Sequence, residues 1–547
     1  RRTFDQVDLW IDALGADGPF EAQGEFLHGG RQWVLEADLG RISRPQLSIN
    51  STLRSGDDIA VKIAGTLATD STPIAFSGQI EADIAKLDLL SKLAGVDALP
   101  ASAGELALSL DTGFSVSSST VRLSDLAVEL GESQATGSAF VTLDGARTIE
   151  LALTASRLDL DTLLPALLAG EGQTPELEPV DTQLWPDDLT LKADLVADAV
   201  VFNASPIRQV HFTAVLDKGA WSISQAEALL PGGTSLALSG EVVVEEDEPV
   251  FRGPVEATSD NLRATLEWLE FDLEGVAQDR LRRVDLFADL FLSPGVIAMT
   301  GLDLGFDSSR LTGGIAARIS EIPSVTAELV LDQINLDAYL PETVASDDAA
   351  EQSDESLAAV VTYISLINLD IDARVDVLTY NGVAVSGLVA DGILLDDKLV
   401  LESFGAADIA GAAVRLSGTV DPVSGSVALQ MGIKAEDAGG LLRLAGVNLP
   451  IDPAELGAVE LVGDITGDAE QAVVRQRLQT ALGAASVDGT WIDPFGTPSF
   501  DGRLGLRSTS YRILAAAFGI DLPDAADSEI AIATDMDQAE LNAVIEV

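Results

Sequence analysis

The sequence predicts a mainly β protein that is built of tandem repeats and carries short helices at the repeat ends. Apolar and polar residues alternate over many short stretches, and turn signals separate these stretches roughly every 8–12 residues, which is typical of an all-β chain. One passage, an alternating strand followed by a helical turn, occurs in six copies. Such self-similarity indicates an array of equivalent units along the chain.

The clearest copy is Thr148–Pro165, with the sequence T-I-E-L-A-L-T-A-S-R-L-D-L-D-T-L-L-P. Ile149, Leu151 and Leu153 alternate with polar or small residues, so an extended strand here would have one apolar face. Leucines then recur at near-helical spacing behind two aspartates. This predicts a short, acidic-capped helical turn that ends at Pro165.

The spacing of the six copies alternates. Their marker residues are Asp88, Asp159, Asn261, Asn335, Asp437 and Ser510, which lie 71, 102, 74, 102 and 73 residues apart. Each long gap contains an acidic segment poor in large hydrophobic residues, a composition typical of a disordered insertion. We therefore predict one continuous repeat array over residues 1–547. Its repeats are expected at 1–100, 101–170, 189–275, 276–341, 357–447 and 448–547, the last with the C-terminal part, and its acidic linkers at 171–188 and 342–356, the second of them disordered.

Within the first repeat, alternation predicts a succession of strands. They are expected at Phe4–Leu14, Phe20–Leu27, Gln32–Leu39, Leu47–Leu53, Ile59–Leu67 and Ile74–Ile84. The step Ser55–Asp58 (S-G-D-D) is a hairpin signal between two of them. Short helices are expected after the strands of successive copies, at Leu87–Leu93, Asn261–Leu273 and Asp437–Leu444.

A small-residue step with an internal glycine also recurs, at one phase of the repeat. It occurs at Ala135–Ser138, Leu238–Glu241, Leu311–Gly314, Leu416–Thr419 and Ser486–Gly489. Glycine inside a strand marks a bulge, a bend or a close backbone approach. We expect a bend that curves every repeat alike.

The charge of the chain excludes several function classes. Its 547 residues include 88 Asp and Glu against 32 Lys and Arg, which gives a formal net charge of −56. Such a surface repels phosphate backbones and anionic membranes, so nucleic-acid binding is not expected. Acidic residues also simply solubilise a body rich in apolar strands, and the charge is explained equally well in that way.

Cysteine is absent, which excludes disulfides and Cys-based catalysis or metal binding. No stretch reaches the roughly 18 apolar residues of a membrane span. The chain starts at Arg1 without an initiator Met, and at its other end it stops at Val547 without a terminating signal. We therefore expect it to be a fragment of a longer protein.

An antiparallel sheet with one apolar face must cover that face. A second sheet, a closed β-helix or a trough filled with lipid chains would each do so. A β-helix would show turns at a short fixed period, and immunoglobulin-like domains would show an aromatic core marker about every 100 residues. Neither pattern is present in a chain with 6 Trp and 4 Tyr.

The steps L-S-G-E and L-S-G-T, each followed by an alternating strand, and the passages L-D-L-D-T-L-L-P and I-N-L-D-A-Y-L-P resemble the repeats of the AsmA family of bacterial envelope proteins. These are relatives of the repeating-β-groove, bridge-like lipid transfer proteins, and the resemblance covers Gln32 to about Arg512. It implies an elongated, curved antiparallel β-sheet groove in the periplasm that carries phospholipid acyl chains between inner and outer membranes. It also implies tethering to the inner membrane by a segment not present in this chain.

The resemblance implies that acyl chains leave water for the groove at about 25 cal/mol per Å² of apolar surface buried. Headgroups would stay at the open edge, and interchangeable aliphatic side chains would let lipids slide. The partners would be phospholipid or other acyl lipids, the two membranes through segments outside this chain, and envelope proteins. The candidate lining residues are Ile149, Leu151, Leu153, Val325, Leu329, Leu331, Val427, Leu429, Met431 and Ile433. The alternative is that these residues pack against one another in a closed sandwich core.

Nothing in the sequence favours an enzyme, a cofactor or a metal. His28 and His211 lie in unrelated contexts, and no phosphate-binding loop or nucleophile elbow is present. Acidic pairs around Asp303 and Asp307, Asp159 and Asp161, and Asp370 and Asp372 lack the loop glycine and distal glutamate of a calcium site.

Two further functions stay open. A periplasmic scaffold or chaperone for outer-membrane protein assembly would pair an exposed strand edge with its client. A surface adhesin would be built of separate sandwich domains.

Overall fold

The computed structural model describes most of the chain. It describes residues 5–28, 30–42, 45–68, 73–87, 89, 105–145, 147–163, 189–246, 248–320, 322–340, 367–421, 424–444, 456–468, 470–492, 499–508, 530–537 and 540–546. The predicted linkers 171–188 and 342–356, the marker residues Asp88 and Ser510, and most of the expected helix Leu87–Leu93 lie outside these residues.

The chain forms two compact units. Unit 1 contains Arg1–Asp272 and Asp289–Pro294, and unit 2 contains Leu273–Ala288 and Gly295–Val547. Strand β16 (Val284–Ser293) is divided between them. The fold class is mainly β, as predicted, and the sheet is open, curved and mostly antiparallel.

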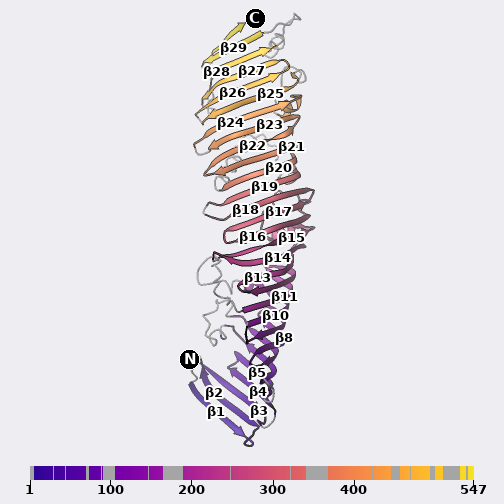
Figure 1. Ribbon diagram of the computed structural model, residues 1–547, viewed down its shortest axis with the longest axis vertical. Helices are drawn as coiled ribbons and strands as arrows, with labels where there is room; N and C mark the ends of the chain where they lie inside the picture. Colours follow the sequence, from indigo (N-terminus) through magenta and orange to yellow (C-terminus); the bar gives the residue numbers. More distant parts are fainter. Residues whose placement is uncertain are drawn as a thin grey trace. The chain divides into compact units, whose positions relative to one another are not determined.

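In unit 1, each strand from β1 to β15 pairs with the next one in the chain (Figure 1). The strands are β1 Asp5–Ala13, β2 Phe20–His28, β3 Arg31–Leu39, β4 Gln46–Ser55, β5 Ile59–Ala68, β6 Ala75–Ile84, β7 Leu108–Val116, β8 Thr120–Leu130, β9 Ser133–Thr142, β10 Arg147–Asp159, β11 Leu189–Phe202, β12 Ser205–Asp217, β13 Ala220–Leu230, β14 Thr234–Glu245 and β15 Glu248–Ser259.

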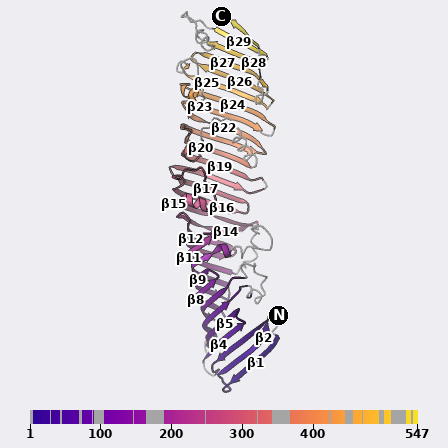
Figure 2. The same ribbon diagram turned by 180° about the vertical axis from the view of Figure 1, so that it is seen from behind.

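Unit 2 repeats this arrangement from β17 to β30, and the view from behind shows the same succession (Figure 2). Its strands are β17 Val296–Phe306, β18 Ser309–Arg318, β19 Ser324–Asn335, β20 Asn368–Tyr380, β21 Val383–Leu395, β22 Lys398–Ile409, β23 Ala412–Asp421, β24 Ser426–Ala435, β25 Val459–Gly467, β26 Gln471–Thr480, β27 Gly483–Ile492, β28 Ser499–Ser508, β29 Ile530–Asp537 and β30 Glu540–Glu546.

Two neighbouring pairs, β10–β11 and β19–β20, are parallel, and this arrangement was not predicted. Parallel strands cannot be joined by a tight turn and need a crossover connection. In each pair the first strand ends where a 102-residue gap begins and the second strand lies inside that gap, so the extra length of the gaps corresponds to the connections between parallel strands.

The parallel pairs also determine where the short helices lie. Starting from the end of β6 and following the strand directions, β10 and β15 end at the same side of the unit 1 sheet. In unit 2 the same holds for β19, β24 and β28. We call this side of each unit the helical rim and the opposite side the hairpin rim.

The helices at the helical rim are short, and the helix expected at Asn261–Leu273 extends only over Leu262–Trp268. The helical turn at residues 160–163 follows β10, and α4 (Leu262–Trp268) follows β15. In unit 2, the 3₁₀ turn η2 (Leu336–Ala338) follows β19, and α6 (Gly439–Leu444) follows β24. Each is therefore an end cap of a repeat, too short to form a helical layer.

The glycine steps lie in the second-to-last strand of the repeats, and there the backbones of neighbouring strands approach closely. Gly313 in β18 and Gly418 in β23 have φ of 137° and 138°, a conformation that side chains rarely permit. A Cβ at Gly313 would lie 1.9 Å from the Glu328 carbonyl oxygen, and one at Gly418 would lie 2.0 Å from that of Ala428. These positions require glycine because the backbones approach closely, which is one of the three features that a glycine inside a strand marks. The predicted bend that curves every repeat alike stays a prediction.

Candidate functional site

In unit 1, the three predicted lining residues of β10 lie on one face of the sheet. Directly paired residues in neighbouring strands share a face. Leu151 pairs with Ala139 of β9 and with Ala193 of β11, which in turn pairs with Ala214 of β12. Ile149 and Leu153 lie in equivalent rows, which contain Val141, Leu191 and Leu216, and Gly137, Leu195 and Phe212. The rows are almost entirely aliphatic, and we call this face the apolar face.

In unit 2, the structure brings the two remaining sets of predicted residues onto a common face. Val325 of β19 is connected to Val427 of β24 by successive direct pairs through Leu369, Leu394, Leu399 and Val420. Leu329 and Leu331 share the face of Val325, and Leu429, Met431 and Ile433 share that of Val427. This is the apolar face of unit 2.

The apolar face is the less exposed face of each sheet. All ten predicted residues are half-buried, whereas Ala152 and Ala428, smaller residues on the opposite face of the same strands, are exposed. Within each unit, the described strands that contact one another are chain neighbours, so no second sheet of described strands covers either face. Side chains converge on the concave side of a curved sheet, so the lower exposure of the larger residues leads us to infer that the apolar face is the concave one.

The apolar face is not closed into a continuous core. Among the described residues, fully buried side chains form two small clusters, each around three residues. One consists of Trp33, Ile59 and Ile84, and the other of Ala155, Ala197 and Val200. Leu89 packs on the first and Leu160 on the second, so residues of the helical turns complete both clusters. The ten predicted lining residues belong to neither cluster and are half-buried.

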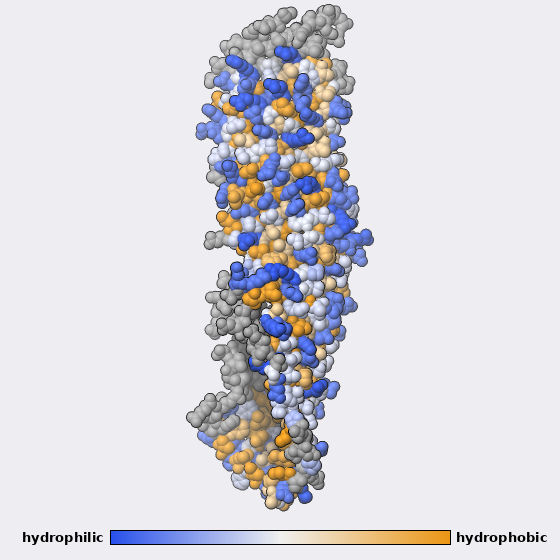
Figure 3. Space-filling model, in the orientation of Figure 1, coloured by the Kyte–Doolittle hydropathy of each residue, from blue (hydrophilic) through white to orange (hydrophobic). Residues whose placement is uncertain are grey.

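The opposite face is polar and carries cross-strand ion pairs. Lys192 of β11 binds Glu150 of β10 at 2.9 Å, and Lys434 of β24 binds Glu460 of β25 at 2.7 Å. Figure 3 shows hydrophilic side chains distributed over the strands among hydrophobic ones. Hydrophobic colour gathers over the N-terminal strands, where Leu9, Trp10 and Ile11 of β1 are exposed.

The repeated L-D-L-D and I-N-L-D passages build the helical rim. Asp159 accepts a hydrogen bond from Thr162 N at 3.1 Å, and Asn335 accepts one from Asp337 N at 3.2 Å, so the first polar residue caps the helical turn. The second polar residue reaches the hairpin turn of the next strand. Asp161 accepts bonds from Asn203 N and Ala204 N, both at 2.8 Å.

Asp337 makes the same contact in unit 2, where it accepts hydrogen bonds from Asn381 N at 2.6 Å and Gly382 N at 2.9 Å. Both residues of each turn have positive φ, between 49° and 70°, which is the geometry of a tight hairpin but unfavourable for a residue such as Ala204. These turns join β11 to β12 in unit 1 and β20 to β21 in unit 2. The carboxylates therefore hold each of these hairpins against the end of the preceding repeat.

Asp307, one of the acidic residues considered for calcium, has a different role. It lies in the turn after β17 and accepts hydrogen bonds from Leu281 N at 2.8 Å, Arg282 N at 3.1 Å and the Tyr339 hydroxyl at 2.8 Å. Burial raises the pKa of Asp307, but these bonds outweigh it and hold the pKa below its usual value. Burial, together with the bond to Asp307, raises the pKa of Tyr339 to about 12.

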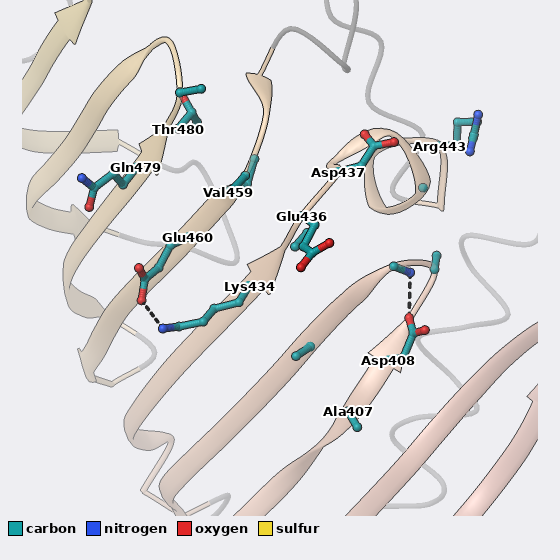
Figure 4. Close-up of a pocket in the computed structure, with 17 residues that line it drawn as sticks. Ala407, Asp408, Lys434, Glu436, Asp437, Arg443, Val459, Glu460, Gln479 and Thr480 are labelled. Atoms are coloured by element: carbon teal, nitrogen blue, oxygen red, sulfur yellow. Dashed lines mark hydrogen bonds and ion pairs between the residues drawn. The ribbon is translucent and has the colours of Figure 1, made fainter.

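One pocket of unit 2 is lined by both polar and apolar side chains. It has a volume of about 990 Å³ and lies between the ends of β22, β24 and β25, near α6 (Figure 4). Lys434 is paired with Glu460 there, and Asp408 accepts a hydrogen bond from Gly411 N. Among the residues that the structure describes, no three His, Asp or Glu side chains are placed to hold a metal ion.

The two histidines lie on different strands, His28 in β2 and His211 in β12. His211 lies on the polar face, 3.1 Å from Asp194 and 3.3 Å from the Thr213 hydroxyl. The backbone oxygen of His28 accepts a hydrogen bond from Trp33. Asp303 pairs with Arg310, and Asp372 pairs with Arg374.

Comparison with protein families, with curated proteins and with solved structures finds no match. None of the helices in the described part of the chain has the length and apolar character that crossing a bilayer requires.

Proposed function

We propose that this chain binds lipid acyl chains along its apolar face and acts as a bridge-like lipid transfer protein of a bacterial envelope, similar to the AsmA family. One observation carries this proposal. The apolar face of each unit is lined by rows of aliphatic side chains that are half-buried and not covered by a second layer of described strands. Such a surface is unfavourable in water and becomes favourable when apolar chains fill it.

The properties of this face agree with transport rather than with tight binding of one ligand. The rows consist of Leu, Ile, Val, Ala and Gly, which differ little in the way they contact a methylene chain. Each buried CH₂ contributes about 0.8 kcal/mol wherever it lies along the rows. A bound chain therefore has similar energy at successive positions and can slide between them. The proposed location is the periplasm, between the inner and outer membranes.

Charge substitutions on the two faces of one strand test the proposal. Leu151→Asp and Leu429→Asp place a carboxylate on the apolar face, whereas Ala152→Asp and Ala428→Asp place one on the polar face of the same strands. Mass spectrometry of purified wild-type protein should detect bound phospholipid. The two Leu variants should retain roughly tenfold less, because a charge among acyl chains is strongly unfavourable, and the two Ala variants should retain the wild-type amount.

Circular dichroism and thermal unfolding separate loss of lipid from loss of fold. Wild-type protein that carries no lipid and takes up none from vesicles would contradict the proposal. Equal lipid loss in folded variants of both faces would contradict the assignment of the apolar face.

A second function, the scaffold for outer-membrane protein assembly, is favoured by β1 alone. This strand lies at the edge of the described sheet of unit 1, and Val7, Leu9 and Ile11 are exposed along it. An unpaired edge of this kind is able to accept a strand from another protein. Photo-crosslinks from Leu9 to polypeptide, with no lipid crosslink from Leu151, would favour the scaffold over lipid transfer.

A further inference from the structure

One short segment of this acidic chain has the opposite charge. Residues 280–283 read R-L-R-R, and no other four consecutive residues contain three basic side chains. Arg282 and Arg283 are exposed, and within the described residues neither has an acidic partner within 4 Å. In contrast, Arg310 and Arg374 of the same unit are paired with aspartates.

Arg280 is incompletely paired. Its side chain is about one-third exposed (35%) and lies 3.7 Å from Asp279, the neighbouring residue. The Nε atom of Arg280 is buried and has no hydrogen-bond partner in the described structure. A buried guanidinium donor without a partner is unfavourable, so this loop retains capacity for an additional acceptor.

The backbone of this basic loop is held in place. Both carboxylate oxygens of Asp307 accept hydrogen bonds from its amides, and Asp307 N donates to the Arg283 carbonyl oxygen at 3.0 Å. The Tyr339 hydroxyl holds the same carboxylate from the other side. The three arginines therefore project from a fixed turn, and little backbone entropy would be lost when they bind a ligand.

The loop lies at the helical rim of unit 2, at the end of β17, which contributes to the apolar face. The lining residue Leu331 pairs with Leu311, and Leu311 pairs with Leu304 of β17. Asp307, which binds the loop, follows Leu304 by three residues at the end of the same strand. An acyl chain on this row would have its polar end within reach of the loop.

We propose that Arg280, Arg282 and Arg283 bind the phosphate of a lipid headgroup whose acyl chains lie on the apolar face of unit 2. This inference rests on the proposed lipid transfer function and adds a site to it. Guanidinium groups bind phosphate oxygens with paired, charge-assisted hydrogen bonds. A headgroup that pauses at this loop would give the otherwise uniform face one preferred position.

The net charge of −56 favours a single headgroup over a whole membrane surface as the occupant. The attraction of three arginines extends over a Debye length of about 8 Å at physiological salt, whereas a membrane would also meet many carboxylates. A phosphate already held next to the loop by its acyl chains does not meet that repulsion in full.

The test uses a phosphatidylglycerol that carries a photoreactive group in its headgroup and a second one that carries it in an acyl chain. Wild-type protein is loaded from vesicles, separated from them and irradiated, and the labelled peptides are identified by mass spectrometry. The test variant is Arg282→Gln with Arg283→Gln, which removes two charges without adding repulsion. The control is Arg318→Gln with Arg415→Gln, two exposed arginines of unit 2 outside the loop.

Headgroup labelling of the peptide that contains 280–283 should fall about tenfold in the test variant and stay unchanged in the control. Acyl-chain labelling of β24 should persist in both. Unchanged headgroup labelling in the test variant would overturn the inference and leave the lipid transfer function standing. Absence of acyl-chain labelling in wild-type protein would overturn both.

Two further outcomes would replace the lipid headgroup as occupant. If inorganic phosphate at millimolar concentration abolishes headgroup labelling but not acyl-chain labelling, the loop is a site for free phosphate. If labelling of the loop occurs only while intact vesicles are present, the loop is a membrane contact. Either result overturns the inference.

Discussion

At the scale of single residues, the structure gives the same polar residue type different roles at different positions. Asp159 caps a helical turn, Asp161 holds the following hairpin turn, and Asp307 holds the basic loop. All three carboxylates accept hydrogen bonds from backbone amides. Their spacing in the sequence resembles that of metal ligands, but it reflects these backbone contacts. Their contacts connect segments that lie 25 to 43 residues apart, except for the local cap at Asp159.

Tyr339 provides a pH-dependent test of the contact that fixes the basic loop. Its pKa in the folded protein is raised from 10 to about 12 by burial and by the bond to Asp307. The contact therefore contributes stability that is fully present below pH 10 and is lost as the pH rises through about 12. Among the four tyrosines, one phenol should ionise near pH 12 in an absorbance titration.

The Tyr339→Phe variant should lack that late step and keep the earlier ones. It should also lose the part of the alkaline destabilisation that depends on this phenol. A titration in which Tyr339→Phe removes a step near pH 10 would contradict the buried hydrogen bond.

The sequence predicted most of these strands but few of these contacts. Alternation determined which side chains of β10, β19 and β24 share a face, because the side-chain period of a strand does not depend on its neighbours. The role of Asp161 could not be predicted, since its partners, the amides of Asn203 and Ala204, lie 42 and 43 residues further along the chain. The basic run at 280–283 was visible in the sequence, but the structure was needed to place it at the end of β17, which contributes to the apolar face.

At the scale of elements, the parallel pairs β10–β11 and β19–β20 account for the alternating repeat lengths. Between the first and the last repeat, the described repeats contain alternately four and five strands, namely β7–β10, β11–β15, β16–β19 and β20–β24. In a fully antiparallel sheet, a five-strand repeat would bring the next helix to the opposite side. A crossover connection before each five-strand repeat returns every helix to one rim. The sequence showed the extra length of the gaps but not the strand direction, because alternation is the same in parallel and antiparallel strands.

The glycines of the second-to-last strands should be intolerant of any side chain. Gly313→Ala and Gly418→Ala combine a left-handed φ with a Cβ about 2 Å from a carbonyl oxygen, so each should destabilise unit 2 by about 2 kcal/mol or more. Gly432→Ala is the matched control, since a Cβ there would meet nothing within 4 Å. Urea unfolding of the three variants would measure the difference. A loss for Gly432→Ala as large as for Gly418→Ala would contradict the close backbone approach.

At the scale of the whole molecule, the chain carries far more charge of one sign than its ion pairs can balance. The cross-strand pairs on the polar face are exposed, and each contributes about 0–1 kcal/mol, which salt weakens. Repulsion among the remaining carboxylates opposes folding along the full length of the chain, and salt weakens this repulsion as well. With 88 acidic and 32 basic residues, repulsion is the larger of the two effects.

Thermal stability should therefore increase with ionic strength. Between about 10 mM and 150 mM monovalent salt, the Debye length falls from roughly 30 Å to 8 Å, and Tm should rise by several degrees. Calorimetry in sodium chloride and in choline chloride would measure the effect, and the two salts should act equally because screening does not depend on the identity of the cation. A rise in calcium chloride that far exceeds the rise at the same ionic strength of sodium chloride would instead indicate specific cation sites, which the contacts of Asp303, Asp307 and Asp372 do not provide.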